Sequence, residues 1–153
     1  MITFRRILAP TDFSAHSHEA LRHACGLAER FGAELHVIHV LSEIIPTGPD
    51  PLLMPVMPPQ FYAQDEERAK EALKTVLRPE WGTPAGLITA VCWGAPAEAI
   101  VDYAAGSAID LLVIATHGRT GLSHILLGSV AERIVREAPC PVLTIRSAPA
   151  ATA

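Results

Sequence analysis

Short apolar segments alternate along the chain with longer segments in which apolar residues recur every three or four positions. Four apolar segments are almost uninterrupted, at residues 7–9, 35–41, 111–115 and 142–145, and a fifth at residues 86–93 is more mixed. Uninterrupted apolar strands are buried on both faces, which is typical of a parallel sheet covered by helices. The pattern therefore predicts five strands.

The segments between these strands have the spacing of amphipathic helices. The first predicted helix ends at Gly32, the second precedes Pro79, the third begins at Pro96, and the fourth runs from Ser129 to Ala138. Their apolar positions are Ala20, Leu21, Ala24, Leu27, Ala28 and Phe31; Ala69, Leu73, Val76 and Leu77; Ala97, Ile100, Val101 and Ala104; and Ile134 and Val135.

Strict alternation of strands and helices predicts an α/β fold, an open, doubly wound five-stranded parallel sheet with helices on both faces. We expect the strand order 3-2-1-4-5, which puts the topological switch point between the first and fourth strands. At this length we expect one domain over residues 1–147 and a short tail at 148–153.

Two connections are longer than such a fold needs. Residues 43–59 hold six of the thirteen prolines together with several Leu and Met residues, so this inserted loop is either a variable surface excursion or a surface for a protein partner. Residues 116–127 span twelve positions between the fourth strand and the last helix, where about 2–6 residues are usual. Since ligands in such sheets lie at the carboxyl ends of strands, this second loop is the best candidate for a site.

Composition and charge exclude several classes of protein. Half of the residues are apolar and 18% are charged, which predicts a folded chain rather than a disordered one. A net charge of −4 without a basic stripe argues against nucleic acid, and no apolar run is long enough for a membrane span. Three widely spaced cysteines without a CxxC pair predict free thiols, and with no signal peptide we expect a cytoplasmic protein.

The scarcity of lysine limits the kinds of phosphate-binding site that the chain can form. Only Lys70 and Lys74 are present, so no glycine-rich turn is followed by the lysine of a P-loop. No GxGxxG follows the first strand and no GxSxG nucleophile turn occurs, which argues against a dinucleotide site and an α/β-hydrolase. The spacing of His117 and Ser129 gives no support to a base and nucleophile pair.

The loop at 116–127 and the turn after the first strand carry the remaining candidates. Gly118 and the pair Gly128–Ser129 would let an anion approach backbone amides at the start of the last helix. Alternatively, Ser129 and Glu132 form a capping box that needs no ligand. Thr11, Asp12 or Ser14, which follow the first strand, can cap the first helix. Alternatively, Asp12 binds a base or ribose at the switch point.

Taken together, these segments resemble the universal stress protein family over nearly the whole chain. The similarity lies in residues 7–14 (ILAPTDFS), 35–40 (LHVIHV), 94–96 (GAP), 110–114 (DLLVI) and 138–143 (APCPVL). The nucleotide motif of the ATP-binding branch is Gly, two residues, Gly, nine residues and Gly-Ser or Gly-Thr. Gly118 and Gly128–Ser129 match it, but Ala115 replaces its first glycine.

The resemblance implies a homodimer joined through the last strand, from Val142 to Ile145, and ATP bound without a P-loop, with Mg²⁺ or Mn²⁺ on the phosphates. Asp12 and Val40 would line the base pocket. Residues near ribose and phosphates would include Gly118 and Gly128. The full predicted nucleotide-binding set is Pro10, Thr11, Asp12, Val40, Ala115, His117, Gly118, Arg119, Gly128, Ser129 and Val130. Alanine at position 115 fits if that residue ends the strand at ordinary negative φ, and costs ~1 kcal/mol or more if φ is positive or if the residue touches the ligand.

Our leading hypothesis is therefore an ATP-binding regulatory protein of the stress response rather than an efficient enzyme. The alternative is a dimeric interaction module that binds no nucleotide and uses the Pro/Met-rich loop at residues 46–59 to bind a protein partner. A slow hydrolase or adenylyl transferase rests only on related sheet architectures, and the signatures of such enzymes are absent from the sequence.

Overall fold

The structure is a computed structural model that describes residues 1–42, 58–118 and 127–147. Most of the proline-rich loop, most of the loop after residue 118, and the tail at 148–153 lie outside the described residues. The elements, in chain order, are β1 (Arg6–Pro10), α1 (Ala15–Phe31), β2 (Glu34–Leu41), α2 (Pro59–Lys74), the 3₁₀ turn η2 (Pro79–Trp81), β3 (Gly86–Trp93), α3 (Pro96–Gly106), β4 (Leu111–Ala115), α4 (Ser129–Glu137) and β5 (Val142–Ile145).

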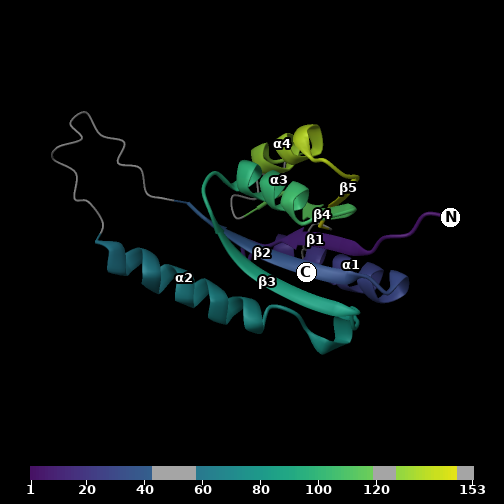
Figure 1. The fold of residues 1–153 in the computed structure, drawn as a ribbon, viewed down its shortest axis with the longest axis horizontal. Coiled ribbons are helices and arrows are strands. Elements are labelled where there is room, and N and C mark those ends of the chain that lie inside the picture. The colour runs from purple at the N-terminus through teal and green to yellow at the C-terminus, as the bar shows by residue number, and fades with distance from the viewer. Residues whose placement is uncertain (43–57, 119–126, 148–153) are drawn as a thin grey trace, which may run out of the picture.

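The five strands form one parallel sheet in the order β3-β2-β1-β4-β5, which confirms the predicted fold class and strand order (Figure 1). β1 lies at the centre, where Ile7 is in register with Leu35 of β2 on one side and with Leu111 of β4 on the other. The fold is therefore the doubly wound arrangement that the alternation of apolar segments predicts.

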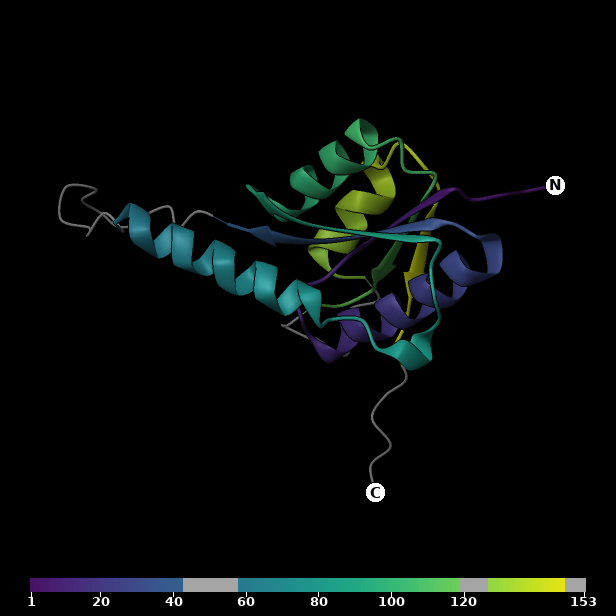
Figure 2. The ribbon, with the colours of Figure 1, turned by 60° about the horizontal axis from the view of Figure 1, so that its bottom comes forward.

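Helices cover both faces of the sheet and bury two separate cores (Figures 1 and 2). On one face, α1 and α2 pack against alternate strand residues such as Ile7 and Val113. On the other face, α3 and α4 pack against Leu8 and Leu112. Adjacent residues of one strand thus enter different cores, which explains why residues 7–9 and 111–115 are apolar at consecutive positions.

The second helix differs from its predicted bounds at both ends. It ends at Lys74 with Thr75 as its C-cap, so Val76 and Leu77 do not continue it as the apolar spacing predicted. Val76 still packs into the core from the following turn, which explains why its position looked helical. The helix begins at Pro59, the last residue of the predicted loop, because proline is suited to the first helical turn.

The geometry that matters for function is a step in the sheet beside β1. The last β1–β2 pair is Pro10 with Ile38, but β2 continues to Leu41 alongside β3. Beyond Ile38, the edge of β2 that faces β1 therefore has no β1 residue in register with it. No helix in the described part of the chain is both long and apolar enough to cross a membrane.

Candidate functional site

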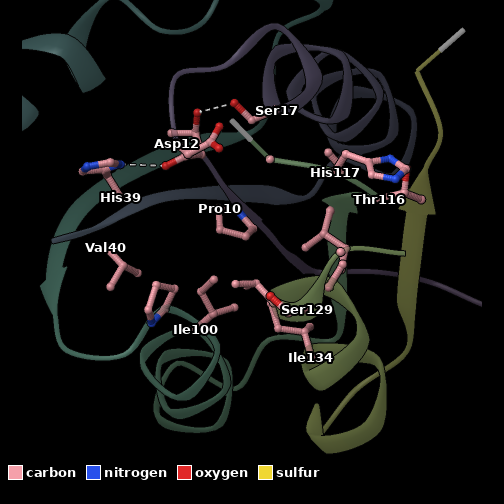
Figure 3. Close-up of a pocket in the computed structure, with 18 residues that line it drawn as sticks. Pro10, Asp12, Ser17, His39, Val40, Ile100, Thr116, His117, Ser129 and Ile134 are labelled. Carbon is pink, nitrogen blue, oxygen red and sulfur yellow. Dashed lines mark hydrogen bonds between the residues drawn. The ribbon is translucent and has the colours of Figure 1, made fainter. Parts of the chain in front are cut away.

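A cavity of about 320 Å³ opens at the carboxyl ends of β1, β2 and β4, between the start of α1 and the helices α3 and α4 (Figure 3). Its volume lies in the range of small-molecule sites, about 300–1,000 Å³. One wall is apolar, and the opposite side carries hydroxyls, an imidazole and a carboxylate. The lining residues are Pro10, Thr11, Asp12, Ser17, His39, Val40, Pro96, Ile100, Ile114, Ala115, Thr116, His117, Gly118, Gly128, Ser129, Val130, Ala131 and Ile134.

The cavity gathers ten of the eleven residues that the sequence analysis named, from four separate segments of the chain. The eleventh, Arg119, lies outside the described residues. Their roles in binding stay predictions, because lining the same cavity does not test whether they bind a ligand. The sequence analysis missed the other eight, of which Ile100 and Ile134 had been assigned only to helix cores.

Hydrogen bonds from its own side chains stabilise the turn between β1 and α1. Ser14 is the N-cap of α1, and its hydroxyl accepts a hydrogen bond from the amide of Ser17 at 3.2 Å. Of the three capping candidates, Ser14 therefore takes that role. The Thr11 hydroxyl accepts from the Phe13 amide at 3.0 Å and lies 3.0 Å from the hydroxyl of Ser17. These bonds hold the turn in one conformation.

The Asp12 side chain contacts both its own turn and the chain that follows β4. Its Oδ1 accepts a hydrogen bond from the Ser14 amide at 3.0 Å. Its Oδ2 lies so close to the backbone of Gly118 that a Cβ at that glycine would be 2.9 Å away. Contacts this short do not occur between a Cβ and another heavy atom, so an alanine at position 118 would require the Asp12 side chain to move.

The start of α4 differs from the predicted capping box. Gly128 is the N-cap, and no side chain caps it within the described residues. The Gly128 amide donates to the Thr116 carbonyl at 2.7 Å, and the first helical bond runs from the Glu132 amide to the Gly128 carbonyl. Ser129 is thus the first helical residue, and the capping-box interpretation is wrong. The cause is the hydrogen bond from the Gly128 amide to the Thr116 carbonyl, which makes Gly128 the N-cap, so the helix begins one residue earlier than a Ser129 cap would place it.

Ala115, which replaces the first glycine of the motif, lies in regular strand structure. Ala115 is the last residue of β4, in register with Ile145 of β5. Phe13 and Ala108 are the non-glycine residues with positive φ in the described chain, so Ala115 has ordinary strand geometry. Of the two settings considered, the strand-end setting is confirmed, and the alanine methyl causes no backbone strain.

His117 uses its ring for contacts with its neighbours. Its Nδ1 lies 3.0 Å from the Thr116 hydroxyl, and its ring centroid lies 6.2 Å from that of His16. In Figure 3 the ring points toward β5 rather than toward Val40 and Ile100. A base-and-nucleophile pair with Ser129 therefore gains no support from the geometry.

Charge at the cavity comes from few groups. Asp12 is the one carboxylate among the lining residues, and no lysine or arginine lines the cavity in the described chain. Lys70 and Lys74 lie on α2 and pair with Glu66, Glu67 and Glu71 of that helix. The described residues include no group of three or more His, Cys, Asp or Glu side chains that could hold a metal ion. An anion here would be bound by backbone amides and the α4 dipole.

Comparison with known proteins agrees with this geometry. The model of the universal stress protein family matches residues 3–146. Universal stress protein MJ0531 of Methanocaldococcus jannaschii is 38% identical over 151 residues, covering 94% of this chain and 82% of that protein. The solved structure of universal stress protein UspA from Lactobacillus plantarum superposes with a TM-score of 0.79 at 27% identity, covering 95% of this chain and all of that one.

Some similar solved structures contain a nucleotide. A universal stress protein crystallised in complex with cAMP superposes with a TM-score of 0.60 at 25% identity, and the match covers 94% of this chain and 98% of that one.

Proposed function

Because the chain belongs to the universal stress protein family, we propose that it binds an adenine nucleotide, ATP with Mg²⁺ or Mn²⁺, in the cavity between β1 and β4. It would act in the stress response by binding rather than by efficient turnover. The observation that carries this proposal is the open start of α4, supported by the relative solved with cAMP.

The start of α4 suits a phosphate group. The amides of Ser129, Val130 and Ala131 precede the first helical hydrogen bond and have no capping side chain within the described residues. A Cβ at Gly128 would lie 3.2 Å from the Thr116 carbonyl oxygen, so glycine lets the start of α4 lie close to the chain that follows β4. Amides at a helix N-terminus together with its dipole favour an anion without any lysine.

The apolar side of the cavity suits a base. Val40, Ile100 and Ile134 lie along one side of the cavity in Figure 3, opposite Asp12 and His39, and Ile114 also lines the cavity. The β2 edge beyond Ile38 lies next to this wall without a β1 partner in register. Its backbone donors and acceptors can therefore pair with the polar edge of a base that is sandwiched between apolar side chains.

The carboxylate of Asp12 suits hydroxyl groups rather than phosphates. It lines the cavity at the turn after β1, and a carboxylate accepts hydrogen bonds from a ribose but repels a phosphate. Asp12 would therefore bind the sugar or the base, between the apolar wall and the start of α4.

A divalent metal fits this site only through the nucleotide. With Asp12 as the one carboxylate among the described lining residues, the protein supplies too few oxygen ligands to hold Mg²⁺ by itself. Such an ion commonly binds through phosphates and water, and when bound it would neutralise phosphate charge near α4. Metal binding should consequently depend on nucleotide.

The test is calorimetric titration of the full chain with MgATP, AMP and cAMP, with analysis of any nucleotide that co-purifies. We expect Gly128→Val and Ser129→Glu to weaken MgATP binding at least tenfold while leaving the fold intact, because they block the amides or place a negative charge on them. Gln64→Glu is the matched control, since it adds the same charge on the exposed surface of α2. No binding of any of these nucleotides by the unmodified chain would overturn the proposal.

We also propose that two copies associate through β5. β5 pairs with β4 and is an edge strand of the described sheet, and Leu143 on it is 38% exposed. An edge strand with an exposed apolar side chain is suited to pairing with a second copy.

A further inference from the structure

His39 is a buried lining residue to which neither the sequence motifs nor the proposed function gives a role. It lies on β2 next to Val40 and is 9% exposed. Its Nδ1 lies 2.8 Å from the carbonyl oxygen of Thr11, a bond drawn dashed in Figure 3. Because a carbonyl oxygen can only accept, Nδ1 carries the hydrogen and donates it. The hydrogen bond thus fixes the tautomer of a neutral His39.

The carbonyl of Thr11 belongs to the peptide that links Thr11 to Asp12. The amide of Thr11 donates to the Ile38 carbonyl at 2.8 Å. Both backbone groups of Thr11 are therefore hydrogen-bonded to β2. Its amide bonds to the backbone of Ile38, and its carbonyl bonds to the side chain of His39. The peptide that leads into Asp12 cannot rotate without breaking the bond to His39.

His39 also contacts the residue after Asp12. The rings of His39 and Phe13 lie 4.6 Å apart at an angle of 37°. Phe13 has a φ of 62°, in the left-handed region that a bulky residue seldom adopts. Backbone strain of this kind persists only where neighbouring groups hold it. The Phe13 amide bonds to the Thr11 hydroxyl and its ring packs on His39, so both contacts keep this conformation.

From these contacts we infer that His39 is a positioning residue for Asp12, directing its carboxylate into the cavity by holding the residues on either side of it. The inference deepens the proposed function, because a nucleotide is the ligand that would report the position of Asp12. It gives His39 the role of a support that acts through Asp12, without contact to the phosphate groups.

The first test compares a variant of His39 that keeps a hydrogen-bond donor with one that removes it. His39→Asn keeps an N–H group near the position of Nδ1, whereas His39→Leu keeps similar bulk without a donor. We expect His39→Leu to raise the Kd for MgATP about fivefold or more, and His39→Asn to stay within about twofold of the unmodified chain. Circular dichroism checks that both variants are folded. Equal losses in both variants, or no loss in either, would overturn the role of the donor.

The second test asks whether the effect runs through Asp12. In an Asp12→Asn background, His39→Leu should change the Kd by less than about twofold, since the carboxylate that it positions is gone. A loss as large as in the unmodified background would show that His39 acts on the ligand independently and would overturn the inference.

The third test needs neither a variant nor a nucleotide. Two-bond ¹H–¹⁵N spectra of the imidazoles should show His39 with its hydrogen on Nδ1, and a hydrogen on Nε2 alone would overturn the inference. This measurement separates the two proposals. If no nucleotide binds, the proposed function fails, and the role of His39 then stands or falls on this spectrum together with the amide shifts of Asp12 and Phe13 in His39→Leu.

Discussion

The carboxylate of Asp12 lies against the backbone of Gly118, so close that a Cβ on the glycine would be 2.9 Å from Oδ2. The two residues come from the ends of β1 and β4, which are adjacent strands in the sheet. This contact joins the turn that carries the carboxylate to the loop that leads toward α4. It also means that a Cβ at position 118 would displace the Asp12 carboxylate even without a ligand.

We expect Gly118→Ala to weaken binding of MgATP about fivefold. The added methyl pushes Asp12 away and breaks its bond to the Ser14 amide, which is worth about 1 kcal/mol. Titration calorimetry measures the affinity. Gly26→Ala is the matched control, since nothing lies within 4 Å of its added Cβ and alanine in a helix should stabilise the fold by about 0.5–1 kcal/mol. Equal affinities for the two variants would contradict this reading of the contact.

Ala115→Gly should restore the motif's glycine without improving affinity. Because Ala115 ends β4 with ordinary strand geometry, a glycine there relieves no strain and costs about 0.5–1 kcal/mol of stability. We expect the Kd for MgATP to change less than twofold and the free energy of unfolding in urea to fall. A clear gain in affinity would mean that the methyl meets the nucleotide.

The buried thiol of Cys25 should make the fold sensitive to alkaline pH. Burial, with a smaller contribution from Glu29, raises the pKa of Cys25 to about 11 from the ordinary 9.0. The folded state therefore binds this proton more tightly than the unfolded state. Its contribution to stability is fully present below pH 9 and is lost as the pH rises through 11, up to about 3 kcal/mol.

Urea unfolding at pH 8 and pH 11 measures this effect, and Cys25→Ala should reduce the difference between the two. Burial also raises the pKa of Cys140, which is partly exposed, so Cys140→Ala should remove a smaller share. The same pH dependence in Cys25→Ala as in the unmodified chain would assign the effect to other groups.

Leu143→Asp should shift the chain toward the monomer if β5 forms the contact between copies. A carboxylate in an apolar interface would raise the dissociation constant at least about tenfold. Leu87→Asp on β3, at the opposite edge of the sheet, is the matched control, because Leu87 is 48% exposed and Leu143 is 38% exposed. Sedimentation velocity over a range of concentrations separates the two. A larger effect from Leu87 would place the contact at the β3 edge.

Much of the fold could be predicted because burial leaves a local record. The central strands β1, β2 and β4 are largely buried on both faces, so their residues are mostly apolar in succession, and each helix faces one core, so its apolar residues recur every three or four positions. The same logic failed at Val76, whose burial comes from a turn rather than from the helix before it. The spacing of apolar residues therefore indicates which positions are buried. It indicates a helix only where the buried positions lie within one.

The sequence by itself determined the strands, the two helix-covered faces and the glycines that open the start of α4, because each depends on neighbouring residues and on the periodicity of burial. Only the tertiary structure decided that Gly128, rather than Ser129, is the N-cap of α4, since the Gly128 amide is bound by Thr116, which follows β4. It also decided the contacts of His39 with Thr11 and Phe13, which join β2 to the turn after β1. Such contacts join residues far apart in the chain, and no local pattern records them.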